Sequence, residues 1–256
     1  MKEKTSQLIS KWLKTGDKSV AIRYMSYFII ALLIFGFCGY AVTKMRLNDA
    51  NCNNLSKIYT GFPKLSSFNP DNAAYKYLLR DYYIKTAYNC CCGGQFKNDW
   101  VNVCALKTCI AQGARVLDFE IYSVNDKPVV ATSSVTNFHT KEMYNQIPFE
   151  DAMNIVNSYA FSGGSTPCPN DPLILHFRIS SNNKKIYDKM ADTIYSTIES
   201  KLLGKEYSYE YTGHNLGAVP LKEFSQKVII SVDRSNPLFE ETPLKEYVNI
   251  ASNSIF

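Results

Sequence analysis

The longest apolar segment lies near the N-terminus, where residues 24–43 carry no charge. At about 1.5 Å rise per residue, a helix of this length spans roughly 30 Å, the thickness of a bilayer's hydrocarbon core. Tyrosines at both ends suit the membrane interface. We therefore predict a transmembrane signal anchor. A cleaved signal peptide stays open, because Gly39-Tyr40-Ala41 has small residues at a suitable spacing, although the apolar run is longer than a usual signal core.

After residue 80, the hydrophobic pattern alternates between strand and helix periods. Strands are predicted at Tyr83–Asn89, Arg115–Tyr122, Pro128–Ala131, Pro172–Ile179 and Lys227–Asp233, and helices at Asp99–Gln112, Phe149–Phe161 and Ile186–Leu202. This alternation indicates an α/β fold with a parallel sheet. An eight-fold barrel needs about 250 residues, and the roughly 170 here supply about half of one. We predict a partial (half) TIM-type β/α barrel behind an N-terminal transmembrane helix.

The chain divides into four predicted parts. They are a basic cytoplasmic tail (1–23), the anchor (24–43), a linker rich in Asn, Ser and Lys (44–80) and a folded domain (81–256). The final residues stop without a turn or a polar tail. The alternative that this chain is part of a longer one with a second half-barrel therefore stays open.

The net charge of +5 is concentrated at the N-terminus. The first 46 residues carry eight Lys/Arg and two acidic groups, and the other 210 carry 20 basic and 21 acidic groups. The folded domain thus lacks the basic field that nucleic-acid binding requires. Six cations precede the anchor, and only Lys44 and Arg46 follow it closely, which predicts a cytoplasmic N-terminus and an extracytoplasmic C-terminal domain.

The N-terminal tail has an amphipathic pattern. Its apolar residues recur at helical spacing among lysines, and they are Leu8, Ile9, Trp12 and Leu13. Such a segment either lies on anionic headgroups or remains a solvated basic tail. Both interpretations stay open.

Asp118 and Glu120 are the most informative polar pair in the folded domain. They share one face of a strand whose other face is apolar. Buried carboxylates must be hydrated, paired or bound to metal. The pair forms either a cation or acid/base site at the mouth of the barrel, or a structural salt bridge, for which Arg178 is a candidate partner.

The three histidines and eight cysteines give weaker signals. His176 shares a strand face with Arg178, whereas His139 and His214 lie in loops. A single histidine is more often structural than functional. In an extracytoplasmic domain some cysteines should pair, but the triplet at 90–92 lacks the spacing of a zinc site.

The segment Gln112–Tyr122 (QGARVLDFEIY) resembles the X domain of phosphatidylinositol-specific phospholipase C. The resemblance rests on a Gly-x-Arg, an acidic-x-acidic strand and a following Pro128-Val129-Val130 strand, and it covers roughly residues 80–235. It implies a phosphodiesterase fold in which two histidines perform acid/base catalysis while calcium or an arginine stabilises the phosphate charge. The amino-acid sequence around residues 86–113 also resembles that of membrane-anchored relatives encoded by large DNA viruses.

The resemblance places several site residues. Asn89, Asp118 and Glu120 match the calcium ligands, and the positions of the two histidines hold Tyr88 and Thr132. Neither replacement titrates near neutral pH as imidazole does.

Two further positions decide what chemistry remains. Arg178 stands where a further acidic ligand is expected, so calcium is disfavoured although the resemblance implies it. An insertion after Val130 would allow His139 to serve as one catalytic histidine, with Arg178 beside it.

These observations favour a single-pass protein whose phospholipase C X-like domain has lost the usual histidine pair. We expect a non-catalytic binding or structural role, including that of a virion membrane component. The alternative is an active phosphoric diester hydrolase in lipid metabolism that uses His139, Asp118, Glu120 and Arg178. Expected partners are the membrane, a phosphoinositide and other membrane proteins, and no cofactor is required.

Overall fold

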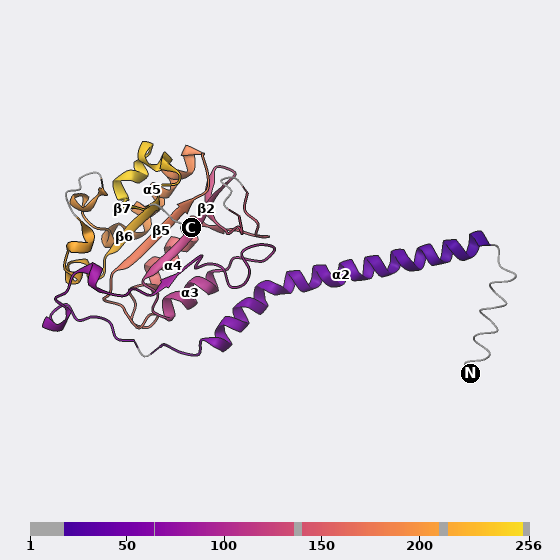
Figure 1. The fold of residues 1–256 in the computed structure, drawn as a ribbon, viewed down its shortest axis with the longest axis horizontal. Helices are drawn as coiled ribbons and strands as arrows, with labels where there is room; N and C mark the ends of the chain where they lie inside the picture. The colour runs from indigo at the N-terminus through magenta and orange to yellow at the C-terminus, as the bar shows by residue number, and fades with distance from the viewer. Residues whose placement is uncertain (1–17, 64, 136–139, 210–214, 253–256) are drawn as a thin grey trace. The chain divides into compact units, whose positions relative to one another are not determined.

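The computed structural model describes residues 18–63, 65–135, 140–209 and 215–252, in two units, Met1–Leu47 and Asn48–Phe256. The first unit contains most of helix α2 (Lys18–Ile58), drawn in indigo in Figure 1. Its apolar side chains are exposed, and α2 is the one helix of the described chain that is long and apolar enough to cross a membrane. A signal sequence passes the same test. The amphipathic tail, with Leu8 and Trp12, lies outside the described residues.

The second unit is built on one sheet, whose strands run in the order β4-β3-β2-β5-β6-β7, with β1 also paired to β2. The pairs β1–β2, β2–β5, β5–β6 and β6–β7 are parallel, and β3 is antiparallel to both of its neighbours. Figure 1 shows β2, β5, β6 and β7 side by side. The strands are β1 (Thr86–Ala87), β2 (Val116–Val124), β3 (Lys127–Val130), β4 (Ile147–Pro148), β5 (Leu173–Ile179), β6 (Val228–Asp233) and β7 (Ile250–Ser252).

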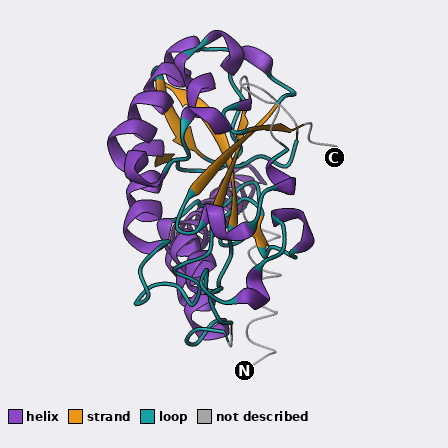
Figure 2. Ribbon diagram, turned by 90° about the vertical axis from the view of Figure 1, so that its left-hand side faces the viewer, coloured by secondary structure: helices purple, strands orange, loops and turns teal. Residues whose placement is uncertain are grey.

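Three α-helices follow strands of this sheet, as the α/β prediction requires. They are α3 (Val103–Ala111), α4 (Phe149–Tyr159) and α5 (Lys184–Ile198). Short 3₁₀ helices fill the connections, at Ala73–Tyr75, Leu79–Asp81, Glu199–Lys201, Lys205–Tyr207, Leu216–Ala218, Leu221–Phe224, Pro237–Glu241 and Pro243–Tyr247. Figure 2 shows helices and strands as separate layers. The mixed α/β fold and the N-terminal apolar helix are thus confirmed.

The larger hydrophobic core lies between the sheet and the three α-helices. Alternate strand residues such as Phe119, Phe177 and Val232 are fully buried there against α3, α4 and α5. Each such side chain contributes roughly 1.5–3 kcal/mol when removed from water. This packing fixes the alternate residues of β2, β5 and β6 on the opposite face, which we call the inner face.

The inner face changes character along the strands. Near the amino ends of the strands, Ile174, Ile229 and Ile250 pack in a second apolar cluster with Leu221 and Phe224. Near the carboxyl ends it carries polar side chains, which are Asp118, Glu120, His176, Arg178, Ser231, Asp233 and Ser252. In parallel β/α folds the carboxyl ends of the strands are where functional groups gather.

The structure corrects several predicted boundaries. The predicted strand Tyr83–Asn89 is reduced to β1, because Asn89 has a positive φ of 45° and its N–H donates to the Asp118 side chain instead of a strand. Helix α3 begins at Val103 instead of Asp99, because the Asn102 side chain accepts the Cys104 N–H as an N-cap. Residues 44–58, predicted as linker, are helical, and β4 and β7 were not predicted.

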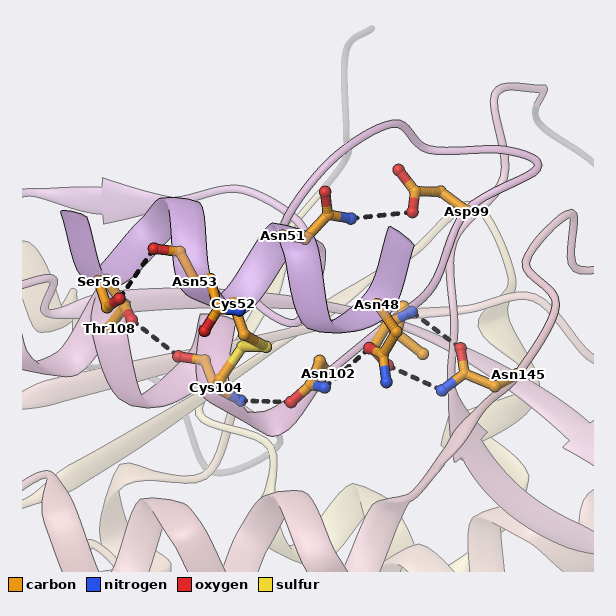
Figure 3. Close-up of a disulfide and its surroundings, with 11 residues drawn as sticks. Asn48, Asn51, Cys52, Asn53, Ser56, Asp99, Asn102, Cys104, Thr108 and Asn145 are labelled. Atoms are coloured by element: carbon orange, nitrogen blue, oxygen red, sulfur yellow. Dashed lines mark hydrogen bonds between the residues drawn. A yellow bond between two sulfur atoms is a disulfide. The ribbon is translucent and has the colours of Figure 1, made fainter. Parts of the chain in front are cut away.

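The end of α2 is fixed within the second unit by covalent and polar contacts (Figure 3). Cys52 forms a disulfide with Cys104 on α3. Asn51 donates to Asp99 at 2.9 Å, and Asn102 donates to Asn48 at 2.8 Å. A side chain at Gly93 would meet Leu55 and Asn51 at 3.3 and 3.4 Å, so this glycine allows the loop after residue 90 to approach α2 closely.

Candidate functional site

The strand register brings the predicted carboxylates beside two basic side chains of β5. Asp118 is paired with His176, and Glu120 with Arg178. Paired residues of parallel strands point to the same face, so these four side chains gather on the inner face. The carboxylates of Asp118 and Glu120 are each 5% exposed. Their charges must therefore be compensated by neighbouring groups.

The guanidinium of Arg178 is the centre of the site. It binds both oxygens of Asp118, with Nε at 3.0 Å from Oδ1 and Nη2 at 2.9 Å from Oδ2. Nη2 also donates to Asn89 Oδ1 at 2.5 Å, and Nη1 lies 3.5 Å from Glu120 Oε2. Bidentate contact of this kind is the strongest form of Arg–carboxylate pairing. The salt bridge considered from the sequence is thus formed.

These contacts set the pKa values of the two carboxyls in opposite directions. Burial acts to raise the pKa of Asp118, but hydrogen bonds from His176, Arg178 and the Asn89 N–H hold it below its ordinary value. Burial raises the pKa of Glu120, because Tyr122, Arg178 and the Ser133 N–H compensate it only in part. Burial also opposes the charge of Arg178, yet Asp118 raises the pKa of its guanidinium. Asp118 and Arg178 therefore form a stable ion pair.

The calcium ligands that the resemblance implied are engaged by this cation. Calcium takes six to eight oxygen ligands. Here the side-chain oxygens of Asn89 and Asp118 already accept hydrogen bonds from Arg178, and a fixed positive charge stands among them. In the described part of the chain, no group of three His, Cys, Asp or Glu side chains is arranged for a metal. The residues present do not fit calcium.

The two positions implied for catalytic histidines have structural contacts. Tyr88 places its ring over Arg178, with the guanidinium carbon 4.6 Å from the ring centroid, and it also contacts Phe96 edge-on at 5.6 Å. Burial raises the pKa of the Tyr88 hydroxyl, against the effect of Arg178. Thr132 is buried, and its hydroxyl donates to the Phe96 carbonyl at 3.0 Å. Neither residue can exchange protons near pH 7 as a histidine does.

An imidazole is nevertheless present, at a different strand. His176 Nδ1 lies 2.7 Å from Asp118 Oδ1, and its Nε2 lies 3.2 Å from the hydroxyl of Ser252 on β7. His176 keeps 18% of its side chain exposed. Its alternation with Arg178 along β5 was a signal in the sequence. Ser252 had none, since nothing in its short polar segment predicted a strand.

Other predicted residues do not join this cluster. His139 and His214 lie outside the described residues. Cys90, Cys91 and Cys109 stay unpaired in the structure, and burial raises the pKa of Cys109 to about 11, which disfavours a thiolate nucleophile. Arg115 of the Gly-x-Arg sequence has a structural role, because its guanidinium donates to the carbonyls of Ala160, Asp171 and Pro172.

A family model identifies the domain. Residues 75–234 match the phosphatidylinositol-specific phospholipase C X domain, close to the region expected from the sequence. No curated protein matches the chain.

Two solved structures share the fold. PLC21 of S. officinalis has a TM-score of 0.55 and 17% identity, over 71% of this chain and 25% of that one. PLC21 of L. pealei has a TM-score of 0.50 and 18% identity, over 62% of this chain and 19% of that one. This chain therefore spans a quarter or less of the length of either protein.

Proposed function

The chain belongs to the phosphatidylinositol-specific phospholipase C X-domain family, and from that premise we propose that it is a membrane-anchored member with a binding or structural role instead of phosphodiester hydrolysis. The observation that carries this proposal is the Arg178 guanidinium among Asn89, Asp118 and Glu120. The ligands are a phosphoinositide headgroup or another membrane protein, recognised at the polar end of the inner face.

The positions of the family's histidines support this proposal. Phosphodiester cleavage requires a base to remove a proton and an acid to protonate the leaving oxygen, and each is typically worth 10²–10⁴ in rate. Tyr88 is stacked on Arg178, and the Thr132 hydroxyl is bound to a carbonyl. At the positions implied for the histidines and the acidic ligand, the domain thus has a fixed cation for an anionic group and no side chain that titrates near neutral pH.

The anchor and the disulfide support the proposed location. Residues 24–43 form an uncharged helix preceded by six cations, which favours a cytoplasmic N-terminus. Cys52–Cys104 is a bond that persists in oxidising compartments, so it favours an extracytoplasmic domain. The narrower sequence resemblance extends the proposal to the membrane of a large DNA virus.

The alternative is an active phosphoric diester hydrolase. The observation in its favour is the imidazole of His176, held by Asp118 beside Arg178. In this alternative His176 or His139 would act as the general base, and Arg178 would take the role of calcium in stabilising the phosphate.

A turnover assay on the full chain in phosphatidylinositol vesicles separates the two functions. We expect no hydrolysis above background with calcium or with chelator. The triple variant Tyr88→His, Thr132→His, Arg178→Glu restores the implied histidines and acidic ligand, and we expect calcium-dependent turnover at least 10²-fold above the parent. Turnover by the parent chain that is lost in His176→Ala or His139→Ala would overturn the non-catalytic proposal.

A further inference from the structure

Three side chains on the inner face form a continuous hydrogen-bonded line, and the proposed binding role uses only Asp118 of the three. We propose that Ser252 is a nucleophile activated by His176 and oriented through Asp118, so that the domain attacks acyl esters as serine hydrolases do. Asp118 comes from β2, His176 from β5 and Ser252 from β7. The two links measure 2.7 Å and 3.2 Å. Such a triad is recognised by geometry and roles, whatever the fold or chain order.

The proton positions follow from the contacts of Asp118. Its oxygens accept from the Asn89 N–H and from two nitrogens of Arg178, as well as facing His176. An ionised carboxylate only accepts hydrogen bonds, so Nδ1 of His176 carries the proton. When the ring is uncharged, Nε2 is a bare acceptor, and the Ser252 hydroxyl, which also lies 3.4 Å from the Val232 carbonyl oxygen, can donate to it. This is the tautomer that general-base catalysis requires.

The surroundings keep this line in place. Asp118 is almost fully buried, and Arg178 fixes its carboxylate in a bidentate contact. His176 sits in the middle of β5, between β2 and β6. Ser231 on β6 lies 3.5 Å from the Ser252 hydroxyl and can donate to it. Ser252 itself is half-buried.

The proposed reaction needs only these side chains, the ester and water. Ser252 Oγ bonds to the ester carbonyl carbon while its proton passes to His176 Nε2. The imidazolium then protonates the leaving alcohol as the C–O bond breaks, which leaves an acyl-serine. Water repeats the two proton transfers in the second half, releasing the carboxylic acid and restoring the neutral imidazole.

The test uses the full chain in detergent and a fluorophosphonate probe, which forms a covalent adduct only with activated serines. Peptide mass spectrometry locates the adduct, and p-nitrophenyl acetate reports turnover. We expect the adduct on Ser252, with labelling lost in Ser252→Ala and at least about 10²-fold slower in His176→Gln. Ser196→Ala is the matched control, because this serine lies exposed on α5, where its hydroxyl donates to the Thr193 carbonyl. This variant should be labelled as the parent is.

The decisive outcome needs no variant. A folded parent chain, with its disulfide intact, that gives no Ser252 adduct under conditions that label a known serine hydrolase overturns the proposal. An adduct on another residue overturns it as well. The inference does not depend on the proposed function, because phosphatidylinositol turnover and serine labelling are separate measurements.

Discussion

The two ends of the inner face are built on the same strands and hold together in different ways. At the amino ends, Ile174, Ile229 and Ile250 pack with Phe224, and packing is non-directional. At the carboxyl ends, Arg178 compensates two buried carboxylates through directional contacts. The first region tolerates apolar exchange, whereas the second depends on each charged partner.

This contrast separates the groups that hold the fold from the groups that form the site. The α/β core and the apolar end of the inner face fix the strands without using any group of the site. The polar end needs only a cation among its carboxylates. The guanidinium of Arg178 meets this need.

The largest expected effect comes from reversing the charge at Arg178. In chelator, Arg178→Glu should lose about 3–5 kcal/mol of unfolding free energy, because it leaves Asp118 and Glu120 buried without a cation. Added calcium should restore much of this loss, because the variant has an all-oxygen ligand set. Chemical denaturation of the full chain in detergent measures both values. Arg178→Met is the control, which should lose stability without a calcium response; a calcium response in the parent chain would contradict the comparison.

At the apolar end, Ile229→Ala should cost about 3 kcal/mol, because this fully buried side chain leaves a cavity. The loss should not vary with calcium, because no charged group is involved. The same denaturation assay checks this, with the exposed Val135→Ala as a control that should change stability by less than about 0.5 kcal/mol. Equal losses in the two variants would contradict the assigned packing.

Neutralising the two carboxylates should change how stability depends on pH, and the smallest effect at neutral pH is expected at Glu120. Asp118 has a lowered pKa, so its contribution is present above its ordinary value of 3.8 and is lost as the pH falls through its folded value. The unfolding free energy of Asp118→Asn should therefore fall less than that of the parent chain as the pH is lowered. Glu120 has a raised pKa, so its charge opposes folding at neutral pH, and Glu120→Gln should change stability by no more than about 1 kcal/mol.

Unfolding curves between pH 3 and pH 7 measure this difference. Matching pH profiles for the two variants would show that the two carboxyls share one environment, against the contacts described.

The sequence predicted the parts of the fold that follow from local periodicity. Alternation placed Asp118 and Glu120 on one face of β2, and His176 and Arg178 on one face of β5. The sequence could not predict how these residues pair between β2 and β5, because strand register depends on packing between distant segments. For the same reason the sequence identified Arg178 as a possible partner but not its contact with Asn89.

The sequence did not predict β7 or the part of α2 that follows residue 43. β7 has three residues with no hydrophobic alternation, and its pairing is set by β6. The helix past residue 43 was missed because charged and Asn-rich residues indicated a linker, whereas tertiary contacts and the Cys52 disulfide hold its end. The sequence thus predicted that some cysteines pair, but not which ones.

That disulfide closes a covalent ring in the chain between residues 52 and 104. The backbone between residues 52 and 104 and the sulfur bridge are two parallel connections between the apolar helix and the domain. A protease that cuts in the exposed stretch around Tyr59 and Phe62 opens only one of them. After such a cut, the apolar helix and the domain separate only when the disulfide is also reduced.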